Sequence, residues 1–296
     1  MSLFNRSVSL FIDKIPPGAI APFAKRYIAG PELSDAVNLT KKLNSQGIMT
    51  TIDVLGEFVS TVDETVHFRN LAIKVLEEID RNRLDANLSL KLTQMGLKIS
   101  KALCIDNVEK IFEKAHELGI FVRMDMEDSS CTDDTLEIYR TYRDKFNIGT
   151  VLQAYMRRTI DDIEWLSDGK LNLRLCKGIY IEPREIAYQE RDIVRDNFIF
   201  CLEELFKRKA YVGIATHDEY LVFHAERLIR KYQLKRDEYE FQMLLGVDEQ
   251  LRKIILSRGH RLRVYVPFGK DWLPYSIRRL KENPNIIKSA LEGYLR

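Results

Sequence analysis

Short apolar runs alternate with helical patterns along most of the chain. Each run has the length and the aliphatic content of a buried strand, and each is followed by a segment with apolar residues at helical spacing. The eight expected strands cover residues 47–55, 86–93, 120–126, 148–155, 171–178, 211–217, 239–246 and 261–269. Segments such as "VEKIFEKAHELG" and "TLEIYRTYRDKF" are the expected helices between them, and Asp248 is placed to begin the helix after the seventh strand.

This repeated alternation predicts an α/β fold, and eight repeats favour a (β/α)8 TIM-like barrel over the competing open, doubly wound sheet. No linker rich in Gly, Ser and Pro and no shift in composition divides the chain. We therefore expect residues 1–296 to form a single domain, in which residues 1–45 are accessory N-terminal helices packed outside the barrel.

A barrel brings the carboxyl ends of its strands together at one mouth, where the active sites of such folds lie. Polar side chains collect at these ends of the predicted strands. They are Lys91, Thr93, Asp125, Glu127, Asp128, Gln153, Arg174, Lys177, Thr216, His217, Asp218, Gln242 and Tyr265. The sequence thus places its candidate chemistry at the mouth.

Two of these strand ends have alternative interpretations. In "RMDMEDSS", Asp125 and Glu127 are predicted to share one side of the pleat and could bind a metal, but no histidine lies nearby and acids are also common at helix starts. We expect no metal site. In "RLCKGIY", Arg174 inside a barrel requires a paired charge, and Gly178 would allow a ligand to approach the backbone closely.

The segment "YSIRRLKENP" is the expected helix after the last strand. At helical spacing, one face carries Tyr275, Arg278, Arg279 and Glu282. The opposite, apolar face would pack on the protein; its residues are Leu273, Ile277 and Leu280. The arginine face is either solvated or a clamp for one carboxylate, which two guanidinium groups bind through paired hydrogen bonds.

Composition excludes several classes of function. The 46 basic and 44 acidic residues leave a net charge of +2, so no electrostatic footprint for nucleic acid is expected. No apolar run reaches the roughly 18 residues of a membrane span, and the N-terminus lacks the apolar core of a signal peptide. The four cysteines are scattered without a CxxC pair, as expected of a reducing cytoplasm.

Together these motifs resemble one known family. "YSIRRLKEN" is similar to the YxxRRxxE motif near the C-terminus of proline dehydrogenases. From about Gly47 onward, further stretches occur in the order of that family: "LGE", "SLKLTQMGL", "RMDMEDS", "VLQAY", "RLCKGIYIEP", "ATHD", "FQMLLG" and "VYVPFG". Single motifs such as "ATHD" are weak, but so many in register are highly specific.

The resemblance implies a distorted (β/α)8 barrel that holds FAD non-covalently. It implies oxidation of L-proline to Δ1-pyrroline-5-carboxylate, the first step of proline catabolism to glutamate, by hydride transfer from proline C5 to flavin N5. Electrons would pass to a membrane quinone, from a cytoplasmic protein that contacts the inner face of the cell membrane. The chain is too short to include a second catalytic domain, so a separate pyrroline-5-carboxylate dehydrogenase would take the product, through a transient contact.

The resemblance also implies residue roles. Asp125, Arg174 and Tyr265 would be the catalytic residues. Substrate binding falls to Lys91, Leu244, Tyr275, Arg278, Arg279 and Glu282. The flavin would be held by Met126, Gln153, Arg174, Lys177, Gly178, Ile179, Thr216 and His217. Cys176 and Ile179 replace the smaller residues common in the family, which affects the expected shape of the flavin pocket.

Two other functions are compatible with the residues alone. A non-catalytic barrel could use the arginine face to bind a small carboxylate ligand. A phosphate-dependent lyase or isomerase would need a glycine-rich loop after the seventh and eighth strands. "LLGVDE" and "PFGKDW" offer one glycine each, which is thin support.

Overall fold

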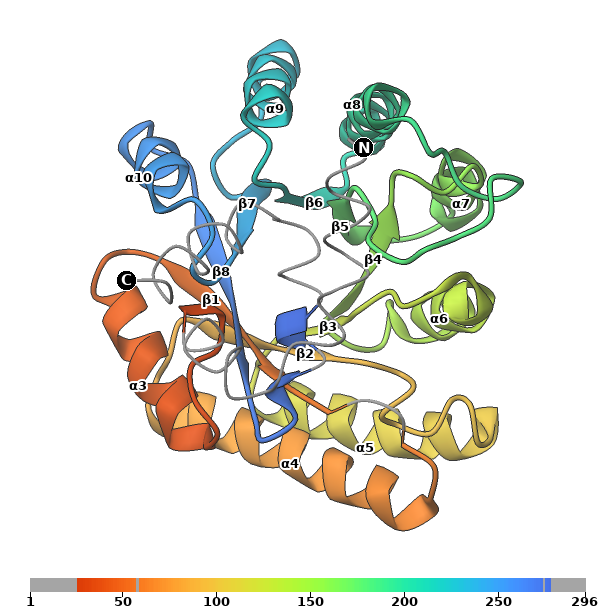
Figure 1. Ribbon diagram of the computed structural model, residues 1–296, viewed down its shortest axis with the longest axis vertical. Coiled ribbons are helices and arrows are strands. Elements are labelled where there is room, and N and C mark those ends of the chain that lie inside the picture. The colour runs from red at the N-terminus through yellow and green to blue at the C-terminus, as the bar shows by residue number, and fades with distance from the viewer. Residues whose placement is uncertain (1–25, 57–58, 274, 278–296) are drawn as a thin grey trace, which may run out of the picture.

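Eight parallel strands form a closed barrel at the centre of the computed structural model (Figure 1). The structure describes residues 26–56, 59–273 and 275–277. The strands are β1 (Met49–Val54), β2 (Ala86–Leu90), β3 (Val122–Met124), β4 (Ile148–Gln153), β5 (Asn172–Cys176), β6 (Tyr211–Ala215), β7 (Tyr239–Leu244) and β8 (Leu262–Phe268). Because β1 pairs with β8 as well as with β2, the barrel closes and the open-sheet alternative is excluded.

Helices surround the barrel and connect successive strands (Figure 1). They are α3 (Leu33–Asn44), α4 (Val62–Arg81), α5 (Lys101–Glu117), α6 (Ser129–Tyr142), α7 (Thr159–Leu166), α8 (Arg191–Lys207), α9 (Glu219–Lys231) and α10 (Glu249–Ser257). Helix α4 begins with a capping box between Thr61 and Glu64. As predicted, Asp248 begins α10, where its side chain accepts a hydrogen bond from Leu251 N at 3.0 Å.

All eight predicted strands are confirmed, but most are shorter than the apolar runs that predicted them. The fifth was expected at 171–178 and is Asn172–Cys176, and the third was expected at 120–126 and is Val122–Met124. The residues removed from the strand ends include Lys91, Asp125 and Lys177. They lie just beyond the hydrogen-bonded ladder, where side chains can turn toward the mouth of the barrel.

The accessory region before the barrel is described only from residue 26 onward. Helix α3 packs against β1 and β8 from outside. The side chain of Asn44, at its end, bonds Ile48 O at 2.8 Å and Asp85 O at 3.1 Å. These bonds fix the helix to the start of two neighbouring strands.

The outward positions of the strands form the hydrophobic core. Fully buried examples are Ile52, Leu88, Val122, Leu173, Ile214, Phe241 and Val264. They belong to one cluster with helix residues such as Leu76, Phe112 and Phe198. Each such side chain contributes roughly 1.5–3 kcal/mol on burial, so this shell between barrel and helices provides most of the driving force for folding.

The inward positions of the strands, in contrast, are polar. Arg174 on β5 donates to Gln242 on β7 at 2.5 Å, a contact between strands that are not neighbours and that must therefore cross the interior. Arg123 on β3 is buried and reaches the carbonyl oxygens of Thr150 and Asn172, each at 2.8 Å. Gly149 makes room for it, because a Cβ there would lie 2.4 Å from Arg123 Nη1.

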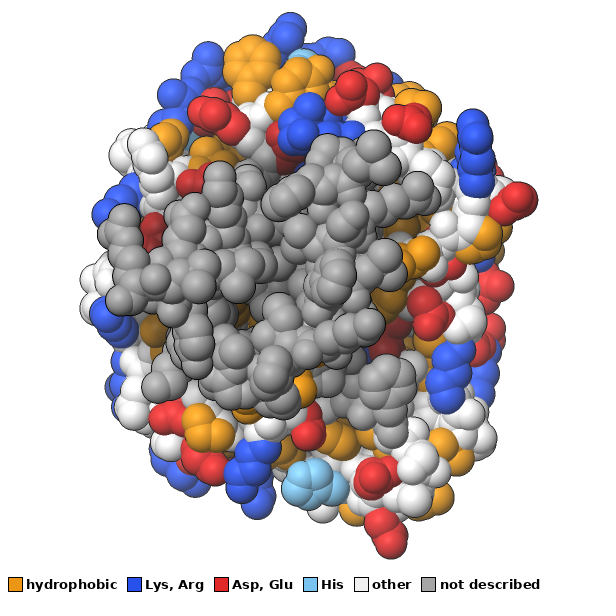
Figure 2. Space-filling model, viewed as in Figure 1, with side chains coloured by type: hydrophobic (Ala, Val, Ile, Leu, Met, Phe, Trp, Pro, Cys, Tyr) orange, Lys and Arg blue, Asp and Glu red, His pale blue; other side chains and the backbone are white. Residues whose placement is uncertain are grey.

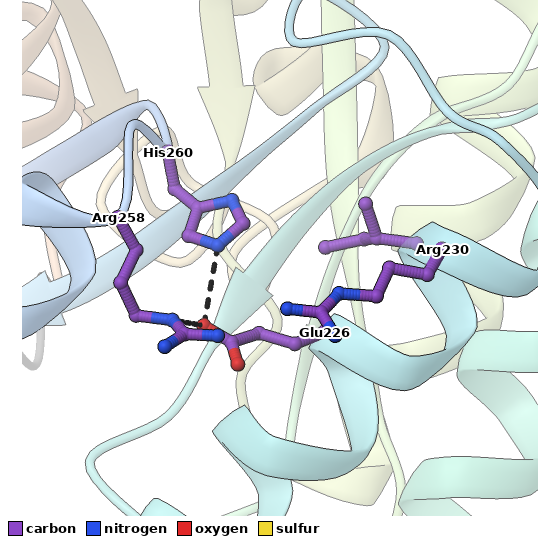
Figure 3. A pocket seen from close by; sticks show the side chains of 5 residues that line it. Glu226, Arg230, Arg258 and His260 are labelled. Carbon is purple, nitrogen blue, oxygen red and sulfur yellow. Dashed lines mark hydrogen bonds and ion pairs between the residues drawn. The ribbon is translucent and has the colours of Figure 1, made fainter.

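A small cavity of about 360 Å³ lies at the opposite end from the mouth, between α9 and the start of β8 (Figure 3). His260 Nε2 lies 3.2 Å from Glu226 Oε1, and Arg258 pairs with the same oxygen. The other ring nitrogen of His260 lies 2.8 Å from Tyr239 OH. Burial lowers the pKa of His260, so the neutral ring joins α9 to two strand starts.

The buried pair of Glu240 and Arg263 provides a test of this polar interior. Burial opposes ionisation of Glu240, but Arg263 at 2.7 Å and donors from Tyr211 and Gln242 outweigh it and lower the pKa to about 2. Arg263→Met leaves this carboxylate buried without its cation. We expect a loss of roughly 3–5 kcal/mol in the free energy of unfolding at pH 7, measured with urea.

The matched control is the double variant Glu240→Gln with Arg263→Met, which should lose less than Arg263→Met alone because no charge is left unpaired. Glu240 contributes its stability above its unfolded pKa of about 4.5 and loses it as the pH falls toward about 2. The penalty of the single variant should therefore shrink in acid. Equal losses in the single and double variants would contradict the pairing.

Candidate active site

A cavity of about 920 Å³ occupies the mouth of the barrel, at the carboxyl ends of the strands. Every described residue that the sequence suggested for catalysis, substrate or cofactor lines it. These are Lys91, Asp125, Met126, Gln153, Arg174, Lys177, Gly178, Ile179, Thr216, His217, Leu244, Tyr265 and Tyr275. Arg278, Arg279 and Glu282 lie outside the described residues. The fold therefore brings together residues up to 184 positions apart, as counted from Lys91 to Tyr275.

Asp125 is the centre of a hydrogen-bond network at the floor of this cavity. Its Oδ1 accepts from Arg174 Nη1 at 2.7 Å and from Ser89 Oγ at 2.6 Å. Its Oδ2 accepts from Tyr265 OH at 2.6 Å. Burial opposes its ionisation, but Arg174, Lys91 and these donors outweigh burial, and the pKa of Asp125 is lowered. Asp125 is therefore a carboxylate at neutral pH.

Lys91 lies beside this network and carries the second cation of the floor. Its Nζ donates to Asp53 Oδ1 at 2.8 Å and lies 3.6 Å from Asp125 Oδ2 and 3.4 Å from Tyr265 OH. Burial disfavours the ammonium form, but the two carboxylates outweigh it and raise the pKa of Lys91. The ammonium thus stays charged, with part of its surface toward the cavity.

Arg174 confirms the expectation that a cation inside the barrel must be paired. Its guanidinium joins Asp125 and Gln242, and it lies 5.5 Å from the centre of the Tyr265 ring. The Arg174 side chain, on β5, therefore contacts residues of β7, of β8 and of the loop after β3. Its position is fixed by the frame of the barrel rather than by a flexible loop.

The three acids of "RMDMEDSS" do not form one site. β3 ends at Met124, so the pleat that would have aligned Asp125 with Glu127 does not extend to them. Glu127 accepts from Thr93 N at 3.1 Å and from Thr93 Oγ1 at 2.5 Å. Asp128 begins α6 by accepting from Ser130 N at 3.0 Å. The helix-start interpretation was right for Asp128, and only Asp125 faces the cavity floor.

The other end of the cavity is rich in cations. Asp218 lies 2.8 Å from Arg195, 3.3 Å from Lys177 and 3.8 Å from Arg191. Burial would raise the pKa of Asp218, but these cations outweigh burial and lower it. Lys177, Arg191, Asp218 and Glu219 line this end of the cavity, which is formed by the loops after β5 and β6 and the start of α8. Arg195 holds Asp218 without lining the cavity and also lies 3.5 Å from Asp192. The ammonium of Lys177 and the guanidinium of Arg191 are groups of the kind that bind phosphate.

His217 and Thr216 lie beside that cation-rich end. His217 Nε2 accepts a hydrogen bond from Leu244 N at 2.8 Å, so in the neutral ring the proton is on Nδ1. Thr216 Oγ1 accepts from Asp218 N at 3.0 Å, which leaves its hydroxyl hydrogen to donate elsewhere. Both residues therefore present a donor near the cavity wall.

Gly178 is required here, although for a reason that the sequence did not reveal. Its φ is +106°, and a Cβ at this position would lie 2.1 Å from Tyr155 Cδ1. The Tyr155 ring of the same chain thus approaches Gly178 closely, and the expected approach of a ligand stays a prediction. The turn directs Lys177 and Ile179 along the cavity wall.

The apolar wall of the cavity combines predicted and unpredicted residues. Leu244 and Tyr275 line it, and Tyr275 is buried in a cluster with Tyr27, Ile28 and Leu55. Tyr27 and Arg26 come from the segment before α3, and Arg26 Nε donates to Gly246 O at 2.8 Å. Sequence reasoning missed these two residues because no motif connects them with strand ends more than 200 positions away.

Gly178→Ala tests the turn that shapes the cavity. The matched control is Gly119→Ala, since Gly119 also has a positive φ of +68° but nothing lies within 4 Å of its would-be Cβ. The control should lose roughly 1–3 kcal/mol through backbone strain alone. Gly178→Ala should lose a further 1–3 kcal/mol or so, because Tyr155 must also move. Chemical denaturation measures both, and equal losses would contradict the Tyr155 contact.

Comparison with known proteins gives the site its context. A family model described as proline dehydrogenase matches residues 36–289. "Proline dehydrogenase 1" of Bacillus subtilis (strain 168) is 35% identical over 274 residues, covering 92% of this chain and 91% of that protein. "Proline dehydrogenase" of Deinococcus radiodurans is 34% identical over 279 residues and covers 92% and 90%.

A solved structure shares the fold. Proline utilization A (PutA) from Bdellovibrio bacteriovorus, inactivated by N-propargylglycine, superposes with a TM-score of 0.83 at 25% identity over 89% of this chain. The chain spans only 33% of the length of that protein. The family model and the two full-length relatives do not depend on this partial match. By these matches, the chain belongs to the proline dehydrogenase family.

Proposed function

We propose that this protein oxidises L-proline to Δ1-pyrroline-5-carboxylate, the first step of proline catabolism, with FAD as a non-covalent cofactor. The observation that carries the proposal is the floor of the cavity. There, two cations and two carboxylates are held in one network with Tyr265, below an apolar wall. Proline combines a carboxylate with a small apolar ring, so a cation next to an apolar wall fits it.

The residues present fit a flavin nucleotide. The cavity, at about 920 Å³, is at the upper end of the range for cofactor sites. At its cation-rich end, Lys177 and Arg191 line the cavity and offer donors that suit a diphosphate. We propose that the flavin is held by Met126, Gln153, Arg174, Lys177, Gly178, Ile179, Thr216 and His217. When bound, it supplies at N5 the acceptor for the hydride from proline C5.

For the substrate, we propose that Lys91 binds the proline carboxylate together with Arg278 and Arg279. Lys91 is supported by its ammonium, which is held at the cavity by Asp53 and Asp125. Leu244, Tyr265 and Tyr275 would enclose the ring, and Glu282 would pair with the arginines. Tyr275 is 6% exposed, which supports a wall that keeps water from the ring.

Asp125, Arg174 and Tyr265 would act on the reaction mainly through position and charge. Asp125, ionised at neutral pH, holds the Tyr265 hydroxyl and the Arg174 guanidinium in fixed orientations. Arg174 would stabilise negative charge that builds on the acceptor, at no reorganisation cost because its contacts already exist. This is the preorganisation that rigid strand positions provide.

We further propose that residues 1–296 act as one domain, that a membrane quinone takes the electrons, and that a separate pyrroline-5-carboxylate dehydrogenase consumes the product after a transient contact. The protein would meet the cytoplasmic face of the membrane from outside the bilayer. In the described part of the chain, no helix combines the length and apolarity needed to cross a membrane. On the face of the protein that Figure 2 shows, basic and acidic side chains are interspersed around the edge.

An absorbance spectrum tests cofactor, substrate and reaction together. Purified protein loaded with FAD should show flavin bands that bleach when L-proline is added without oxygen, and D-proline is the control for specific binding. Bands that L-proline does not bleach would leave a flavoprotein with another substrate. Failure to take up FAD would instead favour a non-catalytic barrel that binds a small carboxylate.

Arg278→Lys and Arg279→Lys test the proposed carboxylate clamp. Each variant keeps the charge but loses the planar pair of donors, so we expect the KM for L-proline to rise roughly 10- to 150-fold, as for hydrogen bonds to a charged group worth about 1.5–3 kcal/mol. Lys281→Arg is the matched control, because in the expected helix Lys281 is not at the i, i+3, i+4 and i+7 positions of Tyr275, Arg278, Arg279 and Glu282. An unchanged KM in both test variants would remove the clamp.

A further inference from the structure

Asp53 is a buried carboxylate that none of the proposed roles uses. It lies on β1, its side chain points into the barrel, and it is 0% exposed. Its Oδ1 accepts from Lys91 Nζ at 2.8 Å. Its Oδ2 is buried without a hydrogen-bond partner in the described part of the chain. Asp53 is not part of the cavity wall, so it can act on a ligand only through Lys91.

Asp53 and Asp125 both lie next to Lys91, but neighbouring groups stabilise their negative charges to very different degrees. The groups that face Asp53 are Lys91 from the end of β2, Asp125 from the end of β3 and Tyr265 from β8, with Arg174 of β5 beyond Asp125. Asp125 accepts three hydrogen bonds from Arg174, Ser89 and Tyr265. Asp53 has one close cation and one repelling carboxylate. It is therefore the less stabilised of the two anions.

The ionisation of the two acids reflects this difference. Burial, opposed by Lys91 and reinforced by the charge of Asp125, raises the pKa of Asp53 to about 6. The pKa of Asp125 is lowered by its neighbours in spite of burial. The charge of Asp53 thus depends on Lys91, its one close cation among the described groups.

A substrate carboxylate that Lys91 shares with Arg278 and Arg279 would be the third anion in contact with the Lys91 ammonium, after Asp53 and Asp125. Each further anion near Lys91 reduces the electrostatic stabilisation that Lys91 gives to the Asp53 carboxylate. Water cannot replace this stabilisation, because Asp53 is fully buried. Asp125 keeps Arg174 and two hydroxyl donors, so it stays ionised. Of the two carboxylates, Asp53 is the one whose ionised form a further anion at Lys91 would disfavour more.

We propose that Asp53 is a positioning residue whose protonation state changes when substrate binds. As a carboxylate it holds Lys91 in place before binding, and it takes up a proton when a substrate carboxylate contacts the Lys91 ammonium. This inference rests on the proposed function, because it requires the carboxylate to bind at Lys91. By linkage, the affinity for the carboxylate then rises as the pH falls toward the range in which Asp53 titrates.

The probe is tetrahydrofuran-2-carboxylate, which has the ring and carboxylate of proline but an oxygen in place of the amine, so it has no proton of its own to lose. Its carboxyl stays ionised between pH 5.5 and 8, since ordinary carboxyl pKa values lie near 4. Titration calorimetry of the FAD-loaded protein, repeated in two buffers of different ionisation enthalpy, counts the protons taken up. At pH 7 we expect uptake of a measurable fraction of one proton per site, and a Kd about tenfold lower at pH 5.5 than at pH 8.

Asp53→Asn has the same shape but cannot titrate. We expect it to bind the probe without proton uptake and with less than about a twofold change in Kd over this pH range, at least as tightly as the wild type does at pH 8. Glu127→Gln is the matched control: burial also raises the pKa of Glu127, yet Glu127 bonds Thr93 and not Lys91. Its proton uptake and pH dependence should remain those of the wild type.

Three results would overturn the proposal: no proton uptake by the wild type, the same pH dependence in Asp53→Asn, or weaker binding by Asp53→Asn at every pH, which would mean a purely structural role. A wild type that fails to bind the probe would overturn it as well. The bleaching of FAD by L-proline is measured separately. If bleaching occurs and the proton uptake does not, the proposed function stands and the role of Asp53 falls.

Discussion

The pairing of charges inside the barrel is the constraint on which the rest of this structure depends. A buried charge without a partner costs several kcal/mol, yet the inward strand positions carry acids and bases from one end of the barrel to the other. Hydrogen bonds and ion pairs join them in one continuous chain: Arg263, Glu240, Gln242, Arg174, Asp125, Tyr265, Lys91 and Asp53. The contacts that stabilise the buried charges are thus also the contacts that hold the site residues in position.

This arrangement explains why a site can be formed from so many strands and still be rigid. Arg174 cannot rotate without losing its hydrogen bonds to both Asp125 and Gln242. The hydrophobic shell between strands and helices supplies the stability, while the polar interior fixes orientation. Folding energy and chemical precision come from opposite faces of the same strands, which the alternation of a β-strand makes possible.

Much of the fold could be predicted from the sequence because its strongest signal is local. Eight apolar runs, each followed by a helical pattern, leave few topologies besides a barrel. The strand ends were less predictable: the apolar run around Leu92 continues past the end of β2 at Leu90, and Leu92 packs in the core from the loop. An apolar run in the sequence indicates which residues are buried. Where the hydrogen bonds of a strand end depends instead on the length of the neighbouring strand.

The polar site residues that were predicted lie at or near the ends of strands, whereas Asp53 and Tyr27 were missed. Asp53 had a signal, since an acid within "GIMTTIDVL" alternates with buried Ile52 and Val54 and must point inward. Tyr27 had none, because its contacts with Leu55 and Tyr275 exist only in the folded chain.

Even a complete list of site residues would not have distinguished Asp53 from Asp125. Both are aspartates near the end of a strand, and both lie next to Lys91. What separates them is the number of donors that the fold brings to each: three strong hydrogen bonds at Asp125 and one at Asp53. Together with the repulsion of Asp53 by the charge of Asp125, this difference moves the two pKa values in opposite directions. The chemistry of a carboxylate is here a property of its neighbours, and those neighbours come from β2, β5 and β8, which only the closed barrel places together.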